Sequence, residues 1–181
     1  MAQNQETKVV TGPVRFSYAN VLTPRSMDGG EPKYSASLII PKRDTATLDR
    51  IKKAIEYAVQ DGKEKFGEKF TALKMPLRDG DKDRPEDEAY AGCMFINANS
   101  KWAPDVVDKD FNPIDSEKVF YSGVVGRASI NFYPYFKNGN KGIAVGLNNV
   151  QKLKDGEPLT SMATAEDDFG DIEINDEDLP F

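Results

Sequence analysis

Residues 126–137 carry, on a single predicted strand, the side-chain types that bind single-stranded nucleic acids. Apolar and polar residues alternate in the sequence GRASINFYPYFK, so every second residue faces the same way. The polar face carries a cation, an amide and phenol rings, from Arg127, Asn131, Tyr133 and Tyr135. Cations can follow the phosphates of a single strand, and each aromatic ring can stack on a base with about 1–3 kcal/mol. The pattern therefore predicts a nucleic-acid-binding face.

The same residues have a structural alternative, in which the tyrosines fill a second small core. Pro134 also interrupts the alternation of residues 126–137. The sequence therefore leaves open which way Tyr135 and Phe136 point.

Two further segments place aromatic and basic residues in predicted loops. Trp102 follows Lys101 in the segment SKWAP, where an exposed indole is the functional reading and a core indole the structural one. The turn KNGNK is a strong hairpin signal that places Lys137 and Lys141 at its tip. Two lysines there could hold a phosphate backbone, or the turn is an ordinary solvated one.

The predicted nucleic-acid-binding site combines these segments with two cations of the first strands. Its members are Arg15, Lys33, Lys101, Trp102, Arg127, Asn131, Tyr133, Tyr135, Lys137 and Lys141.

The elements that must position these side chains are mostly strands. Alternating patterns predict strands over residues 9–22, 33–40, 90–99, 119–136 and 142–153. Asp44 is a good N-cap for an amphipathic helix that follows the second strand and ends near Gly67. Residues 68–89 have no clear period and predict a loop or an arm. Five strands with one prominent helix favour a small, mainly β barrel over a doubly wound sheet.

The last sixteen residues, 166–181, hold eight acidic residues and no basic one, whereas residues 1–165 hold 24 Lys and Arg against 22 Asp and Glu. Such a run repels itself and has little to bury, which predicts a disordered tail. Apolar residues among its acids suit capture by a partner, although a purely solubilising tail is the alternative. The predicted partner-binding residues are Asp176, Glu177, Asp178, Leu179, Pro180 and Phe181.

Catalytic and cofactor motifs are missing from the sequence. The chain has no histidine and one cysteine, and it lacks phosphate-cradling, dinucleotide and zinc motifs. The acids Asp79, Asp81 and Asp83 resemble the start of a calcium loop, but Arg84 and Tyr90 occupy the positions that need glycine and glutamate. We therefore expect a non-catalytic protein without a cofactor, while a weak divalent site at residues 79–88 remains an alternative.

The domain organisation predicted from length and composition is one domain, residues 1–160, followed by the tail, residues 161–181. No apolar run is long enough for a bilayer, and the first residues lack the features of a signal peptide. We expect an intracellular protein without a membrane segment.

Several segments together resemble the bacteriophage single-stranded DNA-binding proteins of the OB-fold type. They are RFSYANVL, KYSASLIIPK, YAGCMFINANSK, YSGVVGRASINFYPYF, NGNKGIAVGLNNVQKLKDGEPL and the acidic tail ending in Phe181. Residues 67–87 and Trp102 match no pattern of that family.

The resemblance implies a five-stranded OB-fold barrel with an inserted helix that coats single-stranded DNA in phage DNA replication and recombination. It also implies a tail that contacts replication proteins such as DNA polymerase, and a location in the cytoplasm of the infected bacterial host. It favours a homodimer. The alternatives are an RNA- or duplex-binding OB module and a metal-dependent nuclease using the acids of residues 79–88.

Overall fold

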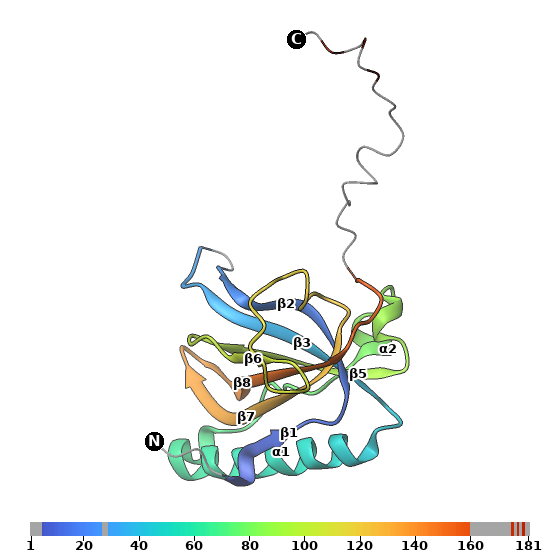
Figure 1. Ribbon diagram of the computed structural model, residues 1–181. Helices are drawn as coiled ribbons and strands as arrows, with labels where there is room; N and C mark the ends of the chain where they lie inside the picture. Colours follow the sequence, from blue (N-terminus) through green and yellow to red (C-terminus); the bar gives the residue numbers. More distant parts are fainter. Residues whose placement is uncertain (1–4, 27–28, 160–174, 176, 178, 180–181) are drawn as a thin grey trace.

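Five strands of the protein form a closed ring. The computed structural model describes residues 5–26, 29–159, 175, 177 and 179. Around the ring, neighbouring strands are β2 (Val14–Arg25), β3 (Lys33–Pro41), β5 (Cys93–Ser100), β8 (Asn140–Lys154) and β7 (Val125–Lys137). β7 returns to β2 through the pairs Val14↔Gly126 and Arg15↔Val125, and β5 and β8 are parallel neighbours. Because the ring has this order, the predicted mainly β, five-stranded OB-fold barrel is confirmed (Figure 1).

The inserted helix, α1 (Thr45–Phe66), lies below the barrel and alongside β7 (Figure 1). It begins where expected, because the Asp44 carboxylate accepts a hydrogen bond from the Thr47 backbone N–H at 3.2 Å. Its buried residues recur at helical spacing and include Leu48, Ile51 and Ala58. The helix ends before Gly67, whose φ of 76° favours glycine.

The core lies inside the ring and between the ring and α1. Inward-facing residues alternate along each strand, for example Leu38 on β3, Ile96 on β5 and Phe132 on β7. Phe16 of β2 packs edge-on against Phe120, with ring centroids 5.1 Å apart. The regular alternation leaves the other residues of each strand on the outer surface of the barrel.

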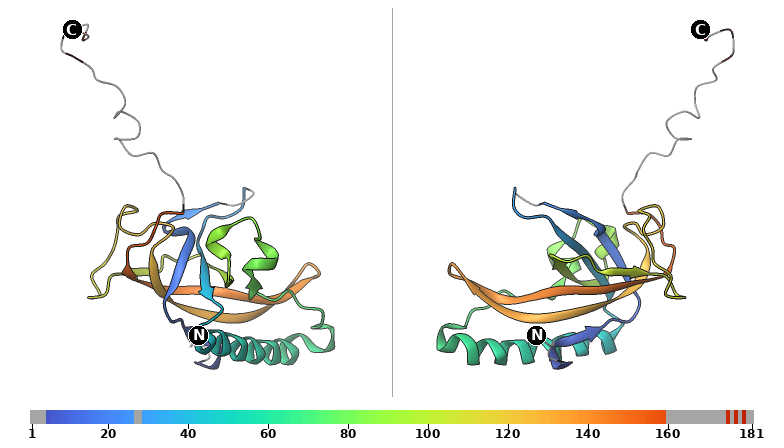
Figure 2. Two further views of the ribbon diagram at one scale, coloured as in Figure 1. Left: turned by 90° about the vertical axis from the view of Figure 1, so that its right-hand side faces the viewer. Right: turned by 60° about the vertical axis from the view of Figure 1, so that its left-hand side comes forward.

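The remaining elements are short and lie around the barrel. β1 (Lys8–Val10) extends the sheet beside β7, β6 (Asp105–Val107) runs parallel to β8, and β4 (Arg78–Asp79) pairs with β5. The other short helices are η1 (Gln5–Thr7), η2 (Gly67–Lys69), α2 (Gly80–Asp83) and η3 (Glu88–Tyr90). Figure 2 shows the β7–β8 hairpin curving above α1. None of the helices of the described residues has the length and apolar character of a bilayer span.

Several sequence-based expectations were wrong. The strand expected over residues 9–22 is divided into β1 and β2 at Gly12–Pro13, because proline cannot donate to a sheet ladder. The strand expected from residue 119 begins at Val125, since residues 119–124 turn to bring Phe120 onto Phe16. Residues 68–89 contain β4, α2 and parts of η2 and η3 and so are partly ordered into short elements. The predicted tail lies almost entirely outside the described residues.

Candidate nucleic-acid interface

A row of small polar residues crosses the outer surface of all five barrel strands. Strand register links its members in pairs, Asn20↔Ser35, Ser35↔Asn99, Asn99↔Gly146 and Gly146↔Asn131. Their immediate neighbours Ala36, Ala98, Ile130, Val145 and Leu147 are in the core, so period-two alternation directs the row itself outward. We call these five residues, Asn20, Ser35, Asn99, Gly146 and Asn131, the polar row.

The polar row has little bulk at its centre. A Cβ atom at Gly146 would lie 3.7 Å from the Asn131 carbonyl oxygen and 3.7 Å from Cε1 of Tyr133. The Tyr133 ring therefore lies against the glycine, at the surface. Asn131 accepts a hydrogen bond from the Thr7 hydroxyl at 3.1 Å, which holds its amide at one end of the row. At the other end, the Asn20 amide donates to the Ser35 hydroxyl at 3.4 Å.

The tyrosines of β7 flank this row. β7 and β8 pair residue by residue through Pro134, with Tyr133↔Ala144 and Tyr135↔Gly142. Both tyrosines therefore keep the outward orientation of Asn131. Tyr133 is 42% exposed. Phe136 points to the opposite face, where its ring centroid is 5.7 Å from that of Phe66. Because Tyr133 is exposed, it fills no second core.

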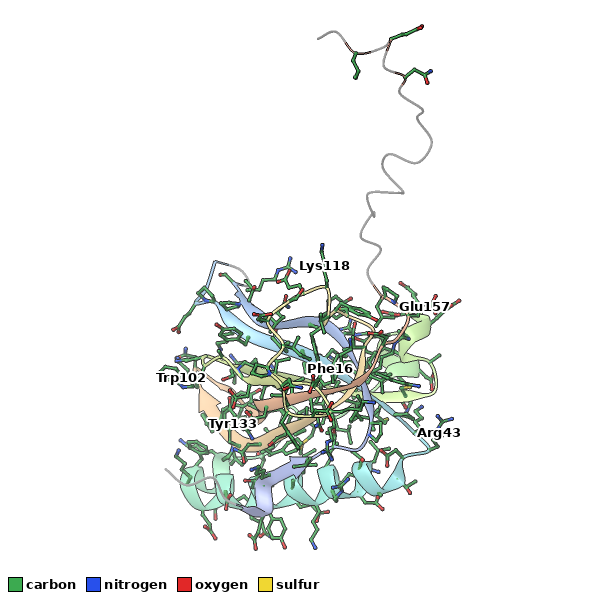
Figure 3. The ribbon with its side chains drawn as sticks, in the orientation of Figure 1. Phe16, Arg43, Trp102, Lys118, Tyr133 and Glu157 are labelled. Atoms are coloured by element: carbon green, nitrogen blue, oxygen red, sulfur yellow. The ribbon has the colours of Figure 1, made fainter. Side chains whose placement is uncertain are left out.

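Trp102 is the most exposed aromatic residue among those described, at 82%. It follows the end of β5, and its backbone N–H donates to the Ser100 hydroxyl at 3.0 Å. Figure 3 shows Trp102 and Tyr133 on the same side of the molecule. The geometry excludes a core position for this indole and leaves it free to stack.

Three predicted cations lie exposed near strand ends and loops. Lys33 is the first residue of β3 and pairs with Arg25, and Lys137 pairs with Asn140 at the β7–β8 turn. Lys101 is 3.8 Å from the Glu31 carboxylate, an exposed pair between the β2–β3 connection and the end of β5. Exposed pairs of this kind contribute about 0–1 kcal/mol, so Lys101 can exchange its partner.

Three other predicted cations are held by contacts of their own. Nη2 of Arg15 donates to the Glu157 carbonyl oxygen at 2.5 Å, and Nε of Arg127 donates to Gln151 Oε1 at 2.5 Å. Nζ of Lys141 donates to the Lys69 carbonyl oxygen at 2.7 Å. The structure does not gather these three with the polar row, and their contact with phosphates remains a prediction.

Sequence reasoning missed part of this surface. Ser35 and Asn99 alternate with core residues in KYSASLII and FINANS, which was a usable signal. Tyr18 gave none. It lies at an irregularity in the β2–β3 register with φ of 47°, a left-handed conformation, and is 54% exposed.

Beside Tyr18 lies a compact segment, residues 78–90, that together with Lys42 we call the acidic cap. Nζ of Lys42 is 2.9 Å from an Asp79 oxygen and 2.7 Å from an Asp81 oxygen. Nε of Arg78 is 3.0 Å from the Asp83 carboxylate. The hydrogen bonds from Lys42 lower the pKa of both Asp79 and Asp81, and those with Asp81 and then Asp79 raise the pKa of Lys42.

Arg84 connects the acidic cap to Tyr18. Its guanidinium carbon is 5.5 Å from the centroid of Tyr18 and 5.2 Å from those of Tyr90 and Phe95. Since its cations take the carboxylates of Asp79, Asp81 and Asp83, the cap is a folded structural unit. No group of three His, Cys, Asp or Glu side chains within the described residues is placed to hold a metal ion.

Comparisons with known proteins match almost the whole chain. A family model described as "Enterobacter phage Enc34, ssDNA-binding protein" matches residues 7–180. The chain is 30% identical over 184 residues to "Putative protein p50" of Acyrthosiphon pisum secondary endosymbiont phage 1, which covers 94% of this chain and 97% of the relative.

Solved structures of the bacteriophage Enc34 single-stranded DNA-binding protein are similar in fold and sequence. The C-terminal truncation matches with a TM-score of 0.74 and 28% identity, over 86% of this chain and 90% of the other. The complex with ssDNA matches with a TM-score of 0.70 and 30% identity, over 86% and 91%. Bacteriophage T7 gp2.5 shares the fold, with a TM-score of 0.61 and 17% identity over 93% and 95%.

Proposed function

The chain belongs to the ssDNA-binding protein family of Enterobacter phage Enc34, and from this membership we propose that it coats single-stranded DNA along the polar row without sequence selectivity. The observation that carries the location is the continuity of the row across five strands between exposed aromatic residues. OB-folds commonly bind oligonucleotides on the outer face of their second and third strands, which correspond to β3 and β5. The family's proteins are non-enzymatic binders, so the chain is not an enzyme.

The binding mechanism follows from the side chains on this surface. Tyr133 and Trp102 offer ring faces on which successive bases stack, and every base has such a face, so stacking tolerates any sequence. Lys33, Lys101 and Lys137 are placed to approach phosphates. Gly146 adds no side chain beside Tyr133, while the amides and hydroxyl of the row supply hydrogen bonds to whichever polar edge lies above them.

The biological role we propose is DNA replication and recombination of a phage, in the cytoplasm of the infected bacterial host. Residues 176–181 bind replication proteins such as DNA polymerase, with Phe181 as the apolar anchor. The tail also competes with DNA, since its eight acids are tethered to a body that is positive without them. A homodimer is proposed on the family resemblance alone.

The test of DNA binding is a titration of labelled oligothymidine with the full-length protein and with Tyr133→Ala. We expect Tyr133→Ala to bind roughly 5- to 150-fold more weakly, which is the loss of one stack of about 1–3 kcal/mol. Circular dichroism and thermal melting should show the variant folded. Equal affinity for RNA, or tighter binding to duplex DNA, would replace the proposal with the RNA- or duplex-binding alternative.

The test of the tail uses two deletions. Removing residues 166–181 should tighten DNA binding, most at low salt, because a tethered polyanion no longer repels phosphates. Removing only Phe181 leaves all eight acids, so DNA affinity should stay the same while binding to the phage or host polymerase weakens. Unchanged DNA affinity after the larger deletion, at every salt concentration, would exclude competition.

A further inference from the structure

A second surface, away from the polar row, combines an apolar concavity with several cations. The concavity measures about 580 Å³, and its apolar lining includes Pro13, Ile39 and Leu153. Arg15, Arg43 and Lys154 also line it. Figure 3 shows Arg43 on the opposite side of the molecule from Trp102. We call this surface the cationic concavity.

The charge of the cationic concavity is one-sided. None of its lining residues within the described part of the chain is acidic. Among the ion pairs of the described residues, none involves Arg15, Arg43 or Lys154. Cys93, the single cysteine, also lines the concavity and is half-buried. A ligand suited to this surface has apolar side chains and several negative charges.

The chain leaves the barrel beside this concavity. The Leu159 backbone N–H donates to the Ser122 carbonyl oxygen at 2.9 Å, and its side chain packs against the cluster that contains Ile39. Cys93, another lining residue, packs against the same cluster. The Glu157 carbonyl accepts a hydrogen bond from Arg15, so one of the cations holds the exit segment itself.

Residues 160–181 can return to the concavity from this exit. A flexible chain of this length has a root-mean-square span of roughly 26 Å, from about 5–6 Å times the square root of the residue number. Tethering gives the chain end an effective concentration on the order of millimolar. The sequence DEDLPF at residues 176–181 carries three carboxylate side chains and two apolar side chains besides proline, the composition that the concavity requires.

We infer that the cationic concavity is the docking site of the chain's own residues 176–181. Phe181 or Leu179 enters the apolar part, and the carboxylates face Arg43 and Lys154. Leu179 is 54% exposed in the structure, so the docked tail is a second state of the protein. Docking there keeps the partner-binding residues covered until a partner takes them. The inference rests on the proposed role of the tail as an interaction segment.

The thiol of Cys93 provides the test, because a docked tail covers it. Burial already raises the pKa of Cys93, and a neutral alkylating agent such as iodoacetamide reports its accessibility without charge bias. The quantity to measure is the ratio of alkylation rates with and without residues 176–181. If docking has a Kd of about 0.1 mM, a millimolar effective concentration gives about 90% occupancy and slows alkylation about tenfold.

Charge reversal then locates the contact. In the double variant Arg43→Glu/Lys154→Glu, the ratio should fall to about one, because the carboxylates lose their partners. The matched control Lys52→Glu/Lys63→Glu makes the same charge change on exposed lysines of α1. Its ratio of alkylation rates should equal that of the parental protein. A ratio of one in the parental protein, or the same loss in both double variants, would overturn the inference.

A disulfide experiment identifies which copy supplies the tail. Mild oxidation of the full-length Leu179→Cys variant should join the introduced thiol to Cys93 within one chain, which gel mobility separates from a dimer. Crosslinked dimers would assign the occupant to a second copy and overturn docking within the chain. Oligothymidine titration of Arg43→Glu/Lys154→Glu separates the two proposals, since loss of tail protection with intact DNA binding concerns only the docking site.

Discussion

The polar row and the acidic cap lie on the same barrel surface and both have cations and aromatic rings close by, but these side chains differ in how they are partnered. In the acidic cap, Lys42 and Arg78 contact carboxylates and Arg84 lies over three rings. Near the polar row, Tyr133 and Trp102 are exposed. Within the described residues, Lys33 and Lys137 have no ion pair.

This difference distinguishes the acidic cap from the surface that we propose binds DNA. A cation held by two close carboxylates, as Lys42 is at 2.9 and 2.7 Å, gains little from a phosphate, whereas an exposed lysine releases counterions when a phosphate arrives. A ring buried under a guanidinium cannot accept a base, whereas an exposed ring can. Changes in the polar row should therefore affect binding, and changes in the cap should affect stability.

The largest expected effect comes from filling the centre of the polar row. Gly146→Glu should weaken ssDNA binding roughly 100-fold, because it removes the space beside Tyr133 and adds a charge that repels phosphates. Gly146→Ala is the matched control, since its Cβ makes only ordinary contacts at 3.7 Å and should bind nearly as the parental protein. If both variants bind equally well, the strand does not cross the row.

The next comparison pairs one tyrosine from each region. Tyr133→Ala should lose roughly 1–3 kcal/mol of binding and little stability. Tyr90→Phe should do the reverse, because it removes the buried hydrogen bond from the Tyr90 hydroxyl to the Ser37 hydroxyl, 3.0 Å long, at a cost of about 1 kcal/mol of unfolding free energy. Binding titrations and urea melts of both variants measure the two effects. A loss of DNA binding in Tyr90→Phe alone would mean that the acidic cap, and not the surface around the polar row, binds DNA.

Salt dependence gives a smaller effect. Three or four phosphate contacts predict a log–log slope of affinity against salt of roughly −2 to −3 for a single strand. Lys33→Ala or Lys137→Ala should each make the slope shallower by about 0.7, whereas Lys42→Ala in the cap should not change it. Fluorescence titrations at several salt concentrations measure the slope, and quenching of Trp102 by oligothymidine provides the signal without a label. A Lys42→Ala slope that changes as much as the Lys33→Ala slope contradicts the comparison.

The smallest expected effect is the pH dependence of the acidic cap. The pKa values of Asp79 and Asp81 are lowered in the folded protein by Lys42, so their stabilisation is present above the unfolded value of about 3.9 and is lost as pH falls through the folded values. Thermal melting of Lys42→Met should thus differ from the parental protein at neutral pH and converge with it in acid. A difference that persists in strong acid would mean that the pairs do not stabilise the cap.

The barrel could be predicted from the sequence because period-two patterns survive in its strands. Residues 33–40 alternate and form β3 within one residue of the expected end. Asp44 identified the start of α1 because capping is a local interaction. The boundary at Val125 was missed because Phe120 packs on Phe16, a contact between residues distant in sequence that no local pattern records.

The site was harder to predict because it depends on strands brought together by the ring. Local patterns identified Tyr133 and Trp102 as exposed aromatic residues, and the structure places them so. The polar row needs the register of four strand pairs, which the sequence does not contain. Arg15 and Lys141 looked like free cations, but their carbonyl partners Glu157 and Lys69 are 142 and 72 residues away.

The two residue pairs that join β2 to β7 can form only late in the synthesis of the chain. Val14 and Arg15 leave the ribosome more than one hundred residues before their partners Gly126 and Val125, and synthesis adds about 5–20 residues per second. For several seconds β2 therefore has β3 on one side and an unpaired edge on the other, the kind of edge that pairs with other chains. Ring closure is a late, long-range event in the folding of this chain, and the yield of folded protein should depend on how quickly β7 arrives.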